Sequence, residues 1–90
     1  MSSDSTDSKI REAIARNVRV ELARADKSKS EFAAEIFGGS RMNAWRRLSG
    51  EVPFSVDQIV RFAIWLGVPV TEIITADVIA IAETREVVAA

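Results

Sequence analysis

The sequence contains no cysteine, histidine or tyrosine among its 90 residues. The absence of cysteine excludes disulfide bonds and thiolate metal sites. Without histidine, the chain also lacks the commonest general base and the commonest metal ligand. No carboxylate pair or activated nucleophile is evident in their place. We therefore expect a protein that is not an enzyme and that needs no metal, other cofactor or small-molecule ligand.

Proline, glycine and long apolar runs are also scarce. The chain has only 2 Pro and 4 Gly, which leaves little room for loops, and its 48% hydrophobic content can form one core. No apolar segment approaches the roughly 20 residues needed to cross a bilayer. The N-terminus lacks the basic region and apolar run of a signal peptide. These features predict one all-α domain in the cytoplasm, without a membrane partner.

Neither sign of charge dominates, since the formal net charge is -1. This balance at first argues against nucleic-acid binding. However, residues 9–75 carry eleven Lys and Arg against eight Asp and Glu, and the other acids lie in the flanks. A nucleic-acid surface needs local positive charge rather than a basic total.

The chain divides into a polar start, a helical domain and an apolar end. Residues 1–8 have no apolar residue after Met1, which predicts a flexible tail. Apolar spacing predicts helices over residues 9–25, 29–37, 41–48 and 56–66, and a fifth from about Val70, within a domain at 9–76. Residues 77–90 fit a strand or a helix, and their alanine content favours a helix.

Helix boundaries in the middle of the chain have local signals. Ser28 with Glu31, and Ser55 with Gln58, have the spacing of capping boxes. The stretch from Ser28 to Gly50 thus contains two short helices joined by a tight Gly-Gly-Ser break. Many small proteins use this arrangement to present a helix to the DNA major groove.

These features together resemble the phage repressor/Cro family of helix-turn-helix proteins, often called XRE-like. The resemblance covers roughly residues 10–74 and is carried by SKSEFA at 28–33, RLSGEVP at 47–53 and LGVP at 66–69. It implies a compact five-helix domain with an extra C-terminal segment, in which the third helix enters the major groove and the start of the second meets phosphates. The turn at residues 37–40 is one residue longer than is usual in the family.

The expected DNA-binding residues combine charge with hydrogen-bonding capacity. Arginine can bond bidentately to guanine and asparagine to adenine. Met42 is expected either to contact a thymine methyl or to be partly buried, and Arg47 either to contact a base or to reach a phosphate. The full set is Lys29, Ser30, Ser40, Arg41, Met42, Asn43, Arg46 and Arg47. Trp45 either donates to a phosphate or, as favoured by its size, packs against the second helix or the loop near Pro53.

A second apolar set predicts self-association. Ile64 and Trp65 point away from the inward stripe of their helix, and further apolar residues follow downstream. We expect a homodimer interface formed by Ile64, Trp65, Val78, Ile79 and Ile81. In the alternative, the C-terminal segment folds back over Ile64 and Trp65 within one chain.

The function expected from these features is sequence-specific binding of double-stranded DNA by a transcriptional regulator. It would be repressor-like or Cro-like, with a phage or prophage among its expected sources, and would bind an inverted-repeat operator as a homodimer. One alternative is an antitoxin or a recombination accessory factor of the same fold. Another is a protein-interaction module without DNA binding.

Overall fold

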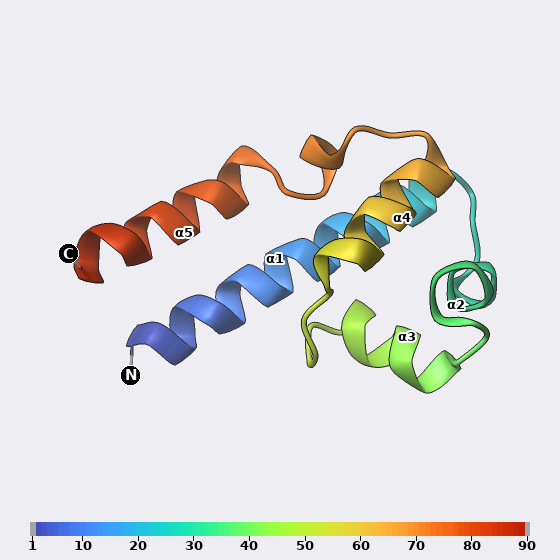
Figure 1. Cartoon of the computed structure of the whole chain (residues 1–90), viewed down its shortest axis with the longest axis horizontal. Coiled ribbons are helices and arrows are strands. Elements are labelled where there is room, and N and C mark those ends of the chain that lie inside the picture. Colours follow the sequence, from blue (N-terminus) through green and yellow to red (C-terminus); the bar gives the residue numbers. More distant parts are fainter. Residues whose placement is uncertain (1, 90) are drawn as a thin grey trace.

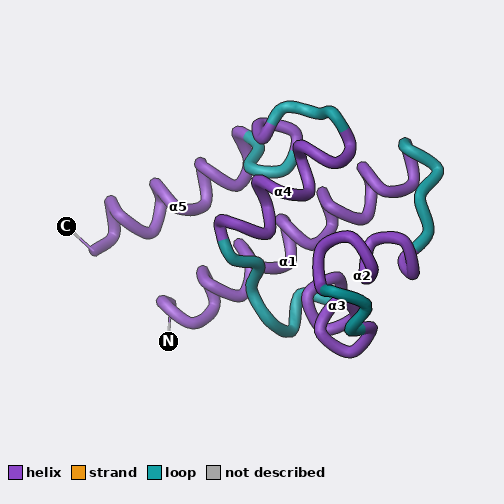
Figure 2. The backbone as a smooth tube through the Cα atoms, turned by 45° about the vertical axis from the view of Figure 1, so that its right-hand side comes forward, coloured by secondary structure: helices purple, strands orange, loops and turns teal. Residues whose placement is uncertain are grey.

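The computed structural model describes the backbone of residues 2–89 and the side chains of residues 5–83. The described chain is all-helical and contains no strand (Figure 2). Its elements are α1 (Ser2–Arg24), α2 (Lys29–Phe37), α3 (Arg41–Leu48), α4 (Val56–Leu66), the 3-10 turn η1 (Val70–Glu72) and α5 (Ala76–Ala89). The predicted all-α class is confirmed. Within these residues, no helix has the length and apolar character that a bilayer span requires.

Two capping boxes fix the starts of α2 and α4, as the sequence predicted. The Ser28 hydroxyl accepts from the Glu31 backbone N–H at 3.0 Å, and the Glu31 carboxylate accepts from the Ser28 N–H at 2.9 Å. Ser55 and Gln58 make the equivalent pair of bonds at 3.1 and 2.9 Å. Each box satisfies two amides that the first helical turn leaves without partners.

The turn between α2 and α3 requires two glycines. Gly38 and Gly39 have φ values of 60° and 93°, which L side chains rarely adopt. The N–H groups of Gly38 and Gly39 both donate to the Ala33 carbonyl, that of Gly39 at 2.9 Å, and so close the end of α2. Ser40 then caps α3, because its hydroxyl accepts from the Asn43 N–H at 3.4 Å. The two helices are therefore joined by a short, hydrogen-bonded turn.

Phe32 lies at the centre of the core and is fully buried. The rings of Phe37, Phe54 and Phe62 meet it edge to face, with centroids 5.5, 6.2 and 5.6 Å away. Such pairs add to the stabilisation from burial alone. Further core residues come from α1, α3, α4 and the segment after η1: Val18, Leu22, Ala44, Leu48, Ile59, Ala63 and Ile73.

Helix α5 packs along α1, and both chain ends lie on the same side of the molecule (Figure 1). The Asn17 side-chain amide donates to the Ile73 carbonyl at 2.8 Å and so connects α1 to the chain just before α5. Arg24, at the end of α1, lies 3.6 Å from the Glu72 carboxylate. The C-terminal part of the chain therefore packs against α1.

Two predicted boundaries are wrong. Residues 2–8, predicted as a tail, continue α1 to Ser2, because extending a formed helix is far easier than nucleating one. Met1 lies outside the described residues. The fifth helix predicted from Val70 is a single 3-10 turn, after which Ile73 enters the core and its carbonyl is held by Asn17. The fifth α-helix is instead the segment predicted as a C-terminal addition, of which Ala90 is not described.

Candidate functional site

Helix α3 has one face in the core and one in solvent. Ala44 and Leu48, one turn apart, are buried. Met42 and Arg46, one turn apart, are exposed on the opposite side, and Arg41 and Asn43 are exposed in the first turn. The helix contains three arginines and no acid. Its free face therefore presents positive charge and hydrogen-bond donors.

Two arginines of α1 hold the end of α3. Arg19 donates to the Leu48 carbonyl, and Arg11 donates to the Gly50 carbonyl at 3.4 Å. Positive side chains at a helix C-terminus satisfy its free carbonyls and interact favourably with its dipole. The direction of α3 is thus fixed at both ends, by the Ser40 cap and by α1.

Arg47 differs from the other arginines of α3. Its guanidinium lies over the Phe37 ring, 5.2 Å from the centroid, and donates to the Asn43 carbonyl at 3.1 Å. Its Nε is buried and has no hydrogen-bond partner among the residues that the structure describes. In this conformation Arg47 braces the junction of α2 and α3 rather than extending outward with Arg41 and Arg46.

The start of α2 lies beside this face. Lys29 and Ser30 are both exposed. A groove of about 220 Å³ is lined by Arg19, Lys29, Trp45, Leu48 and Ser49. Trp45 is 40% exposed there, so more than half of its surface is covered and the rest faces solvent. Its indole lies at a groove that also has two cationic side chains.

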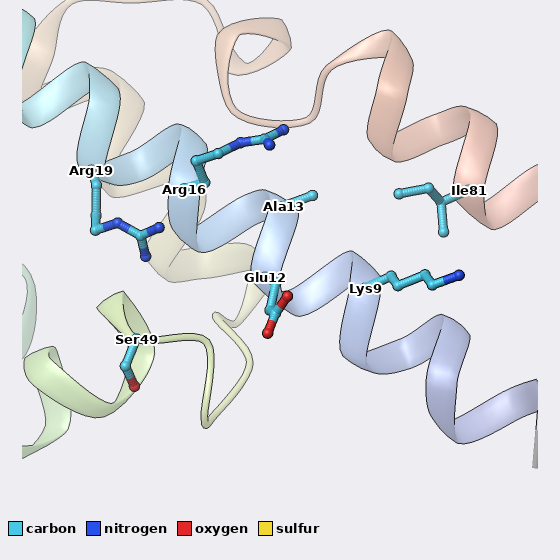
Figure 3. Close-up of a pocket in the computed structure, with 7 residues that line it drawn as sticks. All are labelled: Lys9, Glu12, Ala13, Arg16, Arg19, Ser49 and Ile81. Carbon is cyan, nitrogen blue, oxygen red and sulfur yellow. The ribbon is translucent and has the colours of Figure 1, made fainter.

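A second, larger groove of about 470 Å³ lies between α1, α5 and the end of α3. Figure 3 shows Arg19 directed toward Ser49, with Lys9 and Arg16 farther along α1 toward α5. Glu12 is the one acid among the lining residues. Arg19 and Ser49 line both grooves, so positive charge continues from α2 along α1.

The sequence singled out Lys29 but missed Arg19, Arg16 and Lys9. The spacing of these basic residues can be seen in the sequence, and it places them away from the apolar residues of α1. What the sequence could not show is that α1 brings them beside the end of α3. That placement depends on contacts between residues about 30 apart in the chain, such as Arg19 with Leu48.

The predicted dimer residues do not share one exposed surface. Val78 is buried, and Trp65 packs against the core with Lys27 over its ring at 5.6 Å. Ile81 lines the groove between α1 and α5. Ile64 on α4 and Ile79 on α5 remain exposed. The five residues therefore do not form one exposed patch on a single chain, and of Ile64 and Trp65, which the alternative has the C-terminal segment cover, Ile64 stays exposed.

Comparison with other proteins adds no family assignment. No protein-family model matches the sequence, and neither curated proteins nor solved structures give a significant match. Guanidinium, ammonium, amide and indole donors gathered on one surface suit an anionic partner rich in hydrogen-bond acceptors.

Proposed function

We propose that the chain is a sequence-specific, double-stranded DNA-binding transcriptional regulator of the repressor or Cro type. In this proposal α2 and α3 act as a helix-turn-helix, and α3 enters the major groove. The observation that carries the proposal is the exposure of Arg41, Met42, Asn43 and Arg46 on α3, while Ala44 and Leu48 anchor the helix in the core.

The exposed side chains of α3 have the chemistry to distinguish bases. Arg41 and Arg46 can each bond guanine O6 and N7, and Asn43 can bond adenine N6 and N7. Met42 offers an apolar contact for a thymine methyl group. A good bidentate pair contributes about 1–3 kcal/mol of discrimination against a wrong base. Arg47 supports these contacts indirectly in the observed conformation, because it holds α3 against Phe37.

The groove between α1, α2 and α3 suits the phosphate backbone. Lys29 and Arg19 supply positive charge there and the Trp45 indole a neutral donor, while the exposed Ser30 hydroxyl follows Lys29 at the start of α2. Phosphate contacts of this kind fix the register of a protein on DNA without reading sequence. A chain of net charge -1 can bind a polyanion in this way, because no acid is among the residues that line this groove.

Two copies of the chain are expected to bind an inverted repeat. In this docking mode a dimer places its two reading helices about one helical turn of DNA apart. An operator of this form would overlap a promoter, and occupancy would block transcription.

Selection of binding sites from random duplexes tests this function. The intact chain should enrich one half-site in inverted repeat. The Arg46→Lys variant keeps the charge and loses the planar fork, so it should retain overall affinity and lose preference at particular base pairs. The Lys29→Ala variant should instead weaken all sequences alike and reduce the salt slope by about 0.9.

The negative outcomes are equally defined. If the intact chain enriches no sequence, specific recognition is wrong. If Lys29→Ala alters base preference while Arg46→Lys leaves it unchanged, the assignment of roles to α2 and α3 is wrong.

A further inference from the structure

Helix α4 carries an apolar stripe that its own chain leaves in solvent. Val56, Val60 and Ile64 follow one another at intervals of four residues and are 74%, 41% and 74% exposed. Residues at this interval lie one above the other along a helix. The adjacent side of α4 already supplies the core through Ile59, Phe62 and Ala63. The stripe is thus additional to the apolar surface that folding requires.

Two opposite charges flank the stripe. Asp57 and Arg61 are exposed and lie one turn apart, each directly after a stripe residue. These two charged residues therefore form a second row, which runs parallel to the stripe on its solvent side. Neither has an ion-pair partner among the residues whose side chains are described.

This pattern is complementary to itself in the antiparallel direction. A two-fold axis at Val60 sets Val56 of one copy against Ile64 of the other. The same axis places Asp57 of each copy beside the row of charged residues that contains Arg61 of the other copy. With a rise of about 1.5 Å per residue, the two charged positions differ by about 3 Å along the helices, which an arginine side chain spans easily. Two equivalent ion pairs result.

We infer that α4 packs antiparallel against α4 of a second copy, through Val56, Val60 and Ile64, with reciprocal Asp57–Arg61 pairs. An isologous contact of this kind requires one patch that is complementary to itself, and the stripe satisfies this condition. The inference specifies the homodimer that the proposed function requires, and it replaces the five-residue interface expected from the sequence.

The size of the patch sets the strength of the contact. A standard interface covers about 800 Å² on each partner, whereas this contact is one face of an 11-residue helix. The association is therefore weak and reversible in the free protein. Two half-sites on one DNA would strengthen it by holding both copies close together.

Sedimentation equilibrium of the intact chain without DNA tests the surface. The average mass should rise toward that of a dimer as the concentration approaches about 1 mM. Ile64→Lys should raise the dissociation constant at least about tenfold, since it places a charge in the contact. Ile79→Lys is the matched control on α5 and should have no effect. Far-UV circular dichroism of each variant verifies that the fold is retained.

Charge exchange tests the direction of packing. Asp57→Arg and Arg61→Asp alone each place like charges together, and each should weaken association about fivefold. The double variant restores opposite charges and should recover the original association. A parallel arrangement would not give this recovery.

Three results would overturn the inference: a monomer throughout the concentration range, a dimer that Ile64→Lys leaves unchanged, or a double variant as weak as the single ones. These measurements contain no DNA. Their failure therefore leaves recognition of a single half-site standing, and binding to a half-site duplex distinguishes the two proposals.

Discussion

Gly50 follows the end of α3 and packs against α1. Replacing it with alanine should destabilise the protein by about 2–3 kcal/mol. Its φ of 84° costs an alanine about 1–2 kcal/mol. An added Cβ would also lie 3.3 Å from Glu12 Cγ and 3.4 Å from Glu12 Cα. Relieving that contact requires the loop to move away from α1, at a further cost of about 1 kcal/mol.

Gly39→Ala separates the two contributions. Gly39 has a similar φ of 93°, yet a Cβ there would have no neighbour within 4 Å. This variant should therefore lose only about 1–2 kcal/mol. Urea unfolding followed by circular dichroism gives both free energies of unfolding with one denaturant slope. Equal losses in the two variants would refute the claim that Gly50 is required by close packing against α1.

Three other variants probe the core, a helix cap and the link to α5. Phe32→Ala should lose about 3–5 kcal/mol of unfolding free energy, because three rings pack on Phe32; a loss below about 1 kcal/mol in chemical denaturation would contradict its central place. The pKa of Glu31 lies below its ordinary value of 4.5, chiefly because the Ser28 N–H donates to the carboxylate. The stability difference between the intact chain and Glu31→Gln should be present above pH 4.5 and should disappear as the pH falls through the lowered pKa; a difference that grows with acid would have the wrong sign. Asn17→Ala should cost about 1 kcal/mol and increase hydrogen exchange in α5, because the Ile73 carbonyl loses its donor; unchanged exchange in α5 would refute that link.

The middle of the chain could be predicted because its signals are local. The capping boxes at Ser28 and Ser55 act over three residues, and the Gly38-Gly39 turn acts over four. Each is readable without knowing what the helix packs against. The outward face of α3 followed from the same local pattern, since Ala44 and Leu48 alone can fill its core side.

The ends of the chain were predicted less well because their structure depends on distant contacts. Val78 has the same local character as Ile79, yet one is buried and the other is exposed once α5 lies on α1. The break after Glu72 likewise involves Asn17, which is more than 50 residues away from Ile73 and bonds its carbonyl. Nothing within these segments indicates which partner they will meet.

The division of α3 into an anchored side and a free side has a consequence for how such a protein can change. The residues that hold the helix are Ala44 and Leu48, together with its two end contacts to Ser40 and Arg19. These contacts involve none of the side chains of Arg41, Met42, Asn43 and Arg46. Surface substitutions of this kind usually alter stability by less than about 0.5 kcal/mol. New side chains at these four positions can therefore be tried without first stabilising the domain. A library restricted to them would explore recognition while leaving the scaffold intact.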